Sequence, residues 1–139
     1  MKLLSILMIL LTSCTPIVGN PPTNPSTMKE IVARITYYWP GDCGQSGRKT
    51  STGKTATSNK TVSVDPKIIP YGSKVHIPNM ERTFIAHDTG SDVKKRTASK
   101  KLGKNNIVID VFCDNQREAY DKMKKYPMFM TIKIESSKL

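Results

Sequence analysis

The sequence predicts a mainly β domain, and three features point to it. Six short segments between residues 31 and 134 are rich in β-branched and aromatic residues. Pro, Gly, Asn and Asp residues separate these segments, where they favour turns. A single stretch, after residue 114, has the spacing of an amphipathic helix. Six short strands with one late helix suggest a small closed barrel.

The expected strands follow one another along the second part of the chain. The first, Ile31–Trp39, is β-branched and aromatic and stops at a Pro-Gly pair. The fifth, Ile107–Phe112, is apolar except for one acid, Asp110. The other four are Thr61–Val64, Lys74–Ile77, Thr83–His87 and Met128–Ile134.

One helix is expected between the last two strands. Asn115 is a good N-cap residue, and the helix should run through about Lys125. Ala119, Tyr120 and Met123 then share one face at spacings of three and four residues.

The chain begins with a segment typical of export. Met1 and Lys2 precede the apolar run Leu3–Leu11, which is shorter than the roughly 20 residues that span a bilayer. This pattern is that of a secretory signal. The run ends in Leu11-Thr12-Ser13-Cys14, which resembles a bacterial lipobox. The resemblance implies cleavage after residue 13 and a lipid anchor on Cys14. An ordinary signal with an incidental cysteine is the alternative.

Three regions follow from this beginning. Residues 1–13 are the expected signal peptide. Residues 14–27 are rich in Pro, Asn, Thr and Ser and are expected to form a flexible tether. Residues 28–139 are expected to fold as one domain. By resemblance, the absence of Asp after Cys14 favours the outer membrane, facing the periplasm, where a cell has two membranes.

The chain is strongly basic, with 22 Lys and Arg against 11 Asp and Glu. Such a surface attracts polyanions, among them acidic wall glycans, wall polymers and lipid head groups. Lysines that only solvate the domain are the alternative. Nucleic acid is disfavoured because the chain is expected to be exported.

Two cysteines remain once Cys14 is set aside. Cys43 and Cys113 form an even pair in an oxidising compartment, compatible with a disulfide or with two free thiols. The sequence has no Cys-x-x-Cys or His-rich cluster, so we expect neither a metal nor a cofactor. His87 alone is a weak metal candidate.

The motifs together resemble the three-aspartate (3D) domain family, whose double-psi β-barrel is related to the catalytic barrel of membrane-bound lytic transglycosylases. The matching stretches are Thr36-Tyr37-Tyr38, Thr50-Ser51-Thr52-Gly53, Val64–Ser73, Ala86-His87-Asp88-Thr89-Gly90, Ile109–Phe112, Glu118-Ala119 and Thr131–Ile134. The resemblance implies a six-stranded double-psi β-barrel with one or two short helices. The family's three aspartates fall on Asp65, Asp88 and Asp110.

One segment departs from the family. Where the family usually has a short glycine-rich segment before its third aspartate, this chain has a longer, Lys-rich stretch, Ser91–Asn106. Its basic residues, Lys94 and Lys95 among them, would form either a basic lip that holds an acidic glycan or a mobile solvated loop.

The chemistry of Asp110 follows from its apolar strand. Desolvation raises the pKa of a carboxyl, and a second carboxylate nearby raises it further. A carboxyl that stays protonated near neutral pH can donate its proton to a glycosidic oxygen. The main alternative is a buried ion pair with a lysine.

The resemblance implies a role for each aspartate. Asp110 would be the acid and base, Asp88 would tune its pKa or bind the sugar, and Asp65 would support the site. For Asp65 and Asp88 a turn-forming role is the alternative.

Other polar and aromatic residues are candidate sugar contacts. The hydroxyls of Thr50, Ser51 and Thr52 would bind sugar hydroxyls. Tyr38 and its neighbours Tyr37 and Trp39 would stack on sugar rings or, at alternate positions of a strand, fill the core.

Two functions share these features. The first is a peptidoglycan lytic transglycosylase that cleaves the bond between N-acetylmuramic acid (MurNAc) and N-acetylglucosamine (GlcNAc) and leaves a 1,6-anhydro end. The second is a wall-binding module without catalysis. In either case we expect a monomer that binds peptidoglycan glycan strands and is held to the membrane by lipid. An exported nucleic-acid binder is a third hypothesis, which salt-dependent binding would test.

Overall fold

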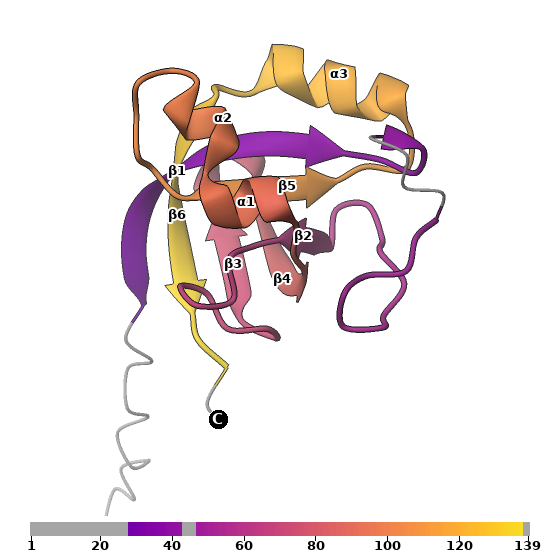
Figure 1. Cartoon of the computed structure of the whole chain (residues 1–139), viewed down its shortest axis with the longest axis horizontal. Coiled ribbons are helices and arrows are strands. Elements are labelled where there is room, and N and C mark those ends of the chain that lie inside the picture. Colours follow the sequence, from indigo (N-terminus) through magenta and orange to yellow (C-terminus); the bar gives the residue numbers. More distant parts are fainter. Residues whose placement is uncertain (1–27, 43–46, 138–139) are drawn as a thin grey trace, which may run out of the picture.

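The computed structural model describes residues 28–42 and 47–137. Within them the chain forms a closed barrel of six strands, in the order β1-β5-β2-β4-β3-β6 (Figure 1). The strands are β1 (Lys29–Tyr38), β2 (Thr61–Ser63), β3 (Lys74–Ile77), β4 (Arg82–Asp88), β5 (Val108–Phe112) and β6 (Phe129–Glu135). The predicted mainly β class and the six-stranded closed barrel are confirmed.

The barrel combines two parallel strand pairs with four antiparallel pairs. β1 pairs parallel with β5, and β2 pairs parallel with β4. The other neighbours, β1/β6, β2/β5, β3/β4 and β3/β6, are antiparallel. Each parallel pair joins segments far apart in sequence, because parallel strands need a crossover connection. Closure leaves the barrel without an unpaired edge strand.

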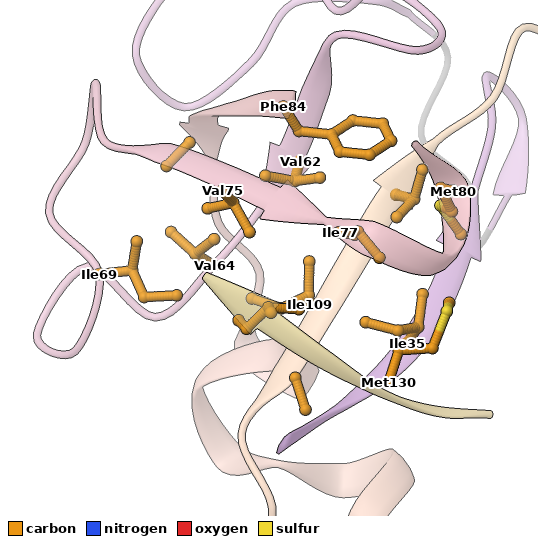
Figure 2. Packing of buried hydrophobic residues seen from close by; sticks show 14 of the residues in the cluster. Ile35, Val62, Val64, Ile69, Val75, Ile77, Met80, Phe84, Ile109 and Met130 are labelled. Atoms are coloured by element: carbon orange, nitrogen blue, oxygen red, sulfur yellow. The ribbon is translucent and has the colours of Figure 1, made fainter. Parts of the chain in front are cut away.

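The barrel interior is filled by alternate residues of the strands. Ala33, Ile35 and Tyr37 of β1 are buried, and so are Ile109 and Val111 of β5. This spacing of two is what a strand with one inward face requires. Figure 2 shows Ile35 and Ile109 within this cluster of buried side chains, with Phe84 next to Val62 at its other side.

Helices cover part of the outer face. α1 (Ser91–Lys95) and α2 (Thr97–Lys100) follow β4 and pack on β5 and β1, while α3 (Gln116–Lys125) lies along β1 (Figure 1). A short 3-10 helix, η2 (Pro78–Met80), joins β3 to β4. Asn115 caps α3 as predicted, since its side chain accepts a hydrogen bond from the Glu118 backbone N–H.

The Lys-rich stretch Ser91–Asn106 is therefore partly helical, which the sequence did not indicate. Val93 and Ser99 of these helices are buried. The junction residue Arg96 has a φ of 58°, in the left-handed region, and ends α1 there. Part of the segment is thus packed on the barrel, while its lysines remain exposed.

Within the described ranges, α3 is the longest helix, and none is long and apolar enough to cross a membrane.

Candidate functional site

Four polar residues lie in one row across four adjacent strands. Thr36 of β1 pairs with Asp110 of β5, Asp110 pairs with Ser63 of β2, and Ser63 pairs with Asp88 of β4. Directly paired residues of neighbouring strands have side chains close together on one face. Two aspartates that are 22 positions apart in the sequence are thus brought to the same side of the barrel.

A β-bulge decides which residue of β4 joins this row. Val62 pairs with Ala86, but the next residue, Ser63, pairs with Asp88. His87 is therefore the extra residue of β4. Without the bulge, His87 would pair with Ser63 in place of Asp88. Bulges re-aim side chains in this way and are common beside functional sites.

The Asp110 carboxyl is half-buried between apolar neighbours of its own strand and the covering helix α1. Thr36 Oγ1 donates a hydrogen bond of 2.7 Å to Asp110 Oδ1. Burial raises the pKa of Asp110 to about 7, although the Thr36 hydrogen bond opposes the rise. Negative charge nearby raises the pKa further, and it comes from Asp42, Asp88 and Asp92. Near neutral pH this carboxyl can both donate and accept a proton.

Asp88 is buried, and three donors hold its carboxylate. Oδ1 accepts from the backbone N–H groups of Ser51 and Thr89, at 2.8 Å and 2.9 Å. Oδ2 accepts from the hydroxyl of Tyr38 at 2.9 Å. Both oxygens are engaged within the protein, so the Asp88 side chain is held in one position in the row.

Tyr38 of β1 contacts both β5 and Asp88 of β4. Its ring packs edge-on against Phe112, with ring centres 5.3 Å apart. Burial and then the adjacent Asp88 raise the pKa of the Tyr38 hydroxyl, which therefore stays a donor. Tyr38 lines the pocket beside both aspartates, and its hydroxyl is directed to a carboxylate of the protein.

The row opens into a pocket of about 280 Å³. Both aspartates lie in its wall, so a ligand there would meet the two carboxyl groups together. The lining residues are Tyr38, Asp42, Ser63, Asp88, Thr89, Gly90, Ser91, Asp92, Val93 and Asp110.

The loop with Thr50, Ser51 and Thr52 lies beside Asp88, but its hydroxyls are largely used within the protein. Thr50 Oγ1 donates to the Lys54 carbonyl, and Thr52 Oγ1 donates to the His87 carbonyl at 2.7 Å. The Ser51 backbone N–H binds Asp88. The loop thus holds the site in place, and these three residues do not line the pocket.

Asp65 lies in the turn after β2. Its Oδ1 accepts from the Lys67 backbone N–H at 3.0 Å, closing the turn after β2. It does not line the pocket that holds Asp88 and Asp110. The wall of this pocket thus holds Asp88 and Asp110, while Asp65 lies in the adjoining turn. Asp65 still adjoins Val64, whose carbonyl accepts from the Thr89 hydroxyl at 2.7 Å.

The basic and cysteine candidates lie elsewhere. Lys94 and Lys95 are exposed on α1 and line neither this pocket nor its neighbour over β1. Cys113 is a buried free thiol, while its expected partner Cys43 lies outside the described residues. Cys14, the signal and the tether also lie outside them.

Sequence reasoning did not assign Thr36, Ser63 or Asp42 to the site. Thr36 precedes Tyr38 by two residues, which places both on the same face of β1. That spacing was the signal available in the sequence. It does not show that Thr36 pairs with Asp110 on β5.

Metal ligands are not grouped in the described part of the chain. Within residues 28–42 and 47–137, no group of three His, Cys, Asp or Glu side chains is placed to hold a metal ion. His87 has its Nδ1 buried without a hydrogen-bond partner, and burial, followed by Lys54 and Lys60, lowers its pKa.

Fold and site together define a small closed β-barrel domain with paired carboxyl groups in an outer groove. The chain belongs to the 3D domain family, whose model matches residues 60–133. The predicted family is confirmed, and the matched region contains all three aspartates.

Two curated relatives of Bacillus subtilis (strain 168) are similar to the chain. It is 37% identical over 101 residues to "Putative cell wall shaping protein YabE", and the matched region covers 70% of this chain and 22% of the relative. It is 38% identical over 105 residues to "Cell wall-binding protein YocH", and the matched region covers 73% of this chain and 32% of the relative. The chain thus spans a third or less of these relatives. Among solved structures, the crystal structure of E. coli MltA with bound chitohexaose matches with a TM-score of 0.42 and 14% identity, over 66% of this chain and 29% of that one.

Proposed function

We propose that the protein is a lytic transglycosylase of peptidoglycan, with Asp110 as its acid and base. The observation that carries this proposal is the half-buried Asp110 carboxyl in the pocket wall, with a pKa of about 7 and a single hydrogen bond, from Thr36. A residue of this kind can give a proton to a leaving group and take one back at the same pH.

The reaction requires only one such group. Asp110 donates its proton to the glycosidic oxygen as the bond from that oxygen to the anomeric carbon of MurNAc breaks. The Asp110 carboxylate then takes the proton of the MurNAc 6-hydroxyl, and the hydroxyl oxygen bonds to the same anomeric carbon. The product is a 1,6-anhydro sugar, and Asp110 is again protonated. Since nucleophile and leaving group belong to one substrate, proximity replaces a bound water.

The setting of Asp88 favours this reaction over a retaining hydrolysis in which Asp88 is the nucleophile. A retaining hydrolase needs a second carboxylate with an oxygen available to attack the sugar. Both Asp88 oxygens are instead held by Tyr38, Ser51 and Thr89. Asp88 is thus a positioning residue, whose charge raises the pKa of Asp110.

Incubation of purified protein with peptidoglycan sacculi tests the proposal, with released fragments identified by mass spectrometry. The wild type should release fragments with 1,6-anhydro ends, and Asp110→Asn should abolish their release. Asp121→Asn, which alters an exposed acid on α3, is the matched control and should retain it. Reducing ends in place of anhydro ends, or full release by Asp110→Asn, would contradict the proposal.

A second candidate is a glycan-binding module without catalysis. The relative named as a cell wall-binding protein, 38% identical over 105 residues, favours it. Sedimentation with sacculi, combined with no product from the wild type, would identify this function.

The location proposed is outside the cytoplasm. The signal-like residues 1–13 and the names of the two relatives, which refer to the cell wall, support export. Lipidation of Cys14 is proposed on the lipobox-like residues before it. Labelling cells with a radioactive fatty acid should mark the wild type and leave Cys14→Ser unlabelled.

A further inference from the structure

A second pocket lies on the other side of Asp110. The first pocket extends over β2 and β4, whereas the second extends over β1 and Met128, the residue before β6. Its volume is about 400 Å³. Asp92, Val93 and Asp110 line both pockets, so Asp110 stands at their junction. A chain of sugars crossing this face would have Asp110 between two of its units.

The helices of the Lys-rich stretch build the outer wall of the second pocket. Val93 of α1, Ala98 of α2 and then Leu102 face Val108 and Met128 of the barrel side across it. These side chains give the pocket a mostly apolar lining, which suits the C–H face of a pyranose ring. The pocket therefore lies between the barrel and the Lys-rich stretch Ser91–Asn106.

Two cations, Arg34 and Lys101, also line the second pocket. Neither forms an ion pair among the described residues. Arg34 is fixed in place because its Nη1 donates to the carbonyls of Ile35 and Met128. Its Nε is buried without a hydrogen-bond partner. Lys104 adds positive charge nearby, since it shares the Phe129 ring with Arg34.

Among the described residues, the acidic groups of the pocket form no direct ion pair with these cations. Asp92 accepts a hydrogen bond from the Thr97 hydroxyl, and Asp110 accepts one from Thr36. Both acids lie where the two pockets join, whereas the cations line only the second. A ligand group that complements Arg34 and Lys101 is an anion on an otherwise apolar ring.

We propose that the second pocket binds the sugar next to the scissile bond through a carboxylate carried by that sugar or its stem peptide, with Arg34 and Lys101 as the counter-charges. The inference rests on the proposed function, because it takes the glycan to lie across Asp110. It makes the Ser91–Asn106 helices a specificity element that selects acidic glycans over neutral ones of the same length.

A binding experiment tests this selection. The probe is a GlcNAc–MurNAc tetrasaccharide with free lactyl carboxylates, and the comparison probe is the same tetrasaccharide with these carboxylates amidated. All proteins carry Asp110→Asn so that no probe is consumed. Lys101→Gln should weaken binding of the acidic probe by about threefold to fivefold, as expected for one partly exposed ion pair, and should leave the amidated probe unaffected. Lys100→Gln alters an exposed neighbour outside the pocket and should change neither.

A third probe identifies the source of the carboxylate. In a peptide-bearing tetrasaccharide the lactyl group is an amide, and only the stem peptide carries carboxylates. Loss of the Lys101 effect with this probe assigns the site to the lactyl group, and a retained effect assigns it to the peptide. Arg34→Lys, which keeps the charge, should preserve the preference for acidic over amidated probe.

The outcomes separate this inference from the proposed function. Equal weakening by Lys101→Gln and Lys100→Gln, an equal loss for the amidated probe, or no change at all would overturn the inference. A Lys101-dependent preference for the acidic probe, together with no anhydro product from the wild type, would keep the subsite and reject the transglycosylase. Anhydro product from the wild type, without a Lys101-dependent preference for the acidic probe, would support the transglycosylase and reject the subsite.

Discussion

Thr36 and Asp110 are direct partners in the parallel pair β1/β5, and the Thr36 hydroxyl donates a 2.7 Å hydrogen bond to Asp110 Oδ1. Burial raises the pKa of Asp110, whereas this hydrogen bond lowers it, and the balance lies at about 7. Thr36 therefore limits how strongly the site holds the proton of Asp110.

Thr36→Val should raise the pKa of Asp110 above 7, because it removes the one donor that stabilises the carboxylate. If the protonated carboxyl is the catalytic acid, product formation falls as the pH rises through this pKa. The falling limb should thus move to higher pH in the variant. Titration of the Asp110 carboxyl by carbon-13 NMR measures the shift directly. Thr36→Ser keeps the hydroxyl and should behave as the wild type, and a downward shift in Thr36→Val would contradict the assignment.

The raised pKa of Asp110 also predicts how stability depends on pH. Its value is about 7 in the folded protein against an ordinary value of 3.8, so the folded state binds more protons between these limits. Asp110 therefore stabilises the fold most below pH 3.8, and this contribution is lost as the pH rises through 7. Urea unfolding should show that the wild type loses about 2 kcal/mol more than Asp110→Asn between pH 5 and pH 8, after allowance for solvent screening. Parallel pH profiles for the two proteins would argue against a shifted Asp110.

The strands were predictable because their signals are local. β-branched residues and turn residues located all six, and β3 has the bounds that the sequence indicated, Lys74–Ile77. The N-cap at Asn115 was equally local. Helices α1 and α2 were missed because Val93 is almost their only large apolar residue turned to the barrel, which is too few to show a helical period.

The candidate site was predictable only in part, because it depends on pairing between distant strands. An acid within an apolar strand identified Asp110, but nothing near it in the sequence points to Thr36, which lies 74 residues away. The bulge that brings Asp88 rather than His87 into the row is a property of the β2/β4 pair. The family motif groups Asp65 with the other two acids, but it does not show that the Asp65 carboxylate accepts the Lys67 backbone N–H in the turn after β2.

Tyr38→Phe should destabilise the protein by about 1 to 2 kcal/mol, because a buried carboxylate oxygen of Asp88 loses its donor. The ring contact with Phe112 would remain. Product formation should also fall, since Asp88 would be less firmly held in the row. Urea unfolding and the anhydro-product assay measure the two effects. Tyr120→Phe alters an exposed tyrosine on α3 and is the control. Equal losses of stability and of product in the two variants would show that the hydrogen bond from Tyr38 to Asp88 contributes to neither.

Asn115→Ala should lower the free energy of unfolding by about 1 kcal/mol, the usual cost of losing an N-cap. The side chain now accepts the Glu118 backbone N–H at 3.0 Å, and alanine would leave that donor without a protein partner at the start of α3. Asn115→Asp keeps an acceptor and should retain most of the stability. Thermal or urea unfolding distinguishes the three proteins, and a stable Asn115→Ala would show that packing alone maintains the helix start.

Val93→Ala should loosen the cover over Asp110. Val93 is 5% exposed and is the apolar side chain by which α1 borders both pockets. Loss of two buried methyl groups should cost about 1 to 2 kcal/mol. Because burial is the main cause of the raised Asp110 pKa, a looser α1 should let that pKa fall below 7. Hydrogen exchange of the α1 and α2 amides and carbon-13 NMR titration of Asp110 should change together. Lys94→Ala, at an exposed position of the same helix, is the control; faster exchange in Val93→Ala with an unmoved Asp110 pKa would show that α1 does not contribute to the burial of the acid.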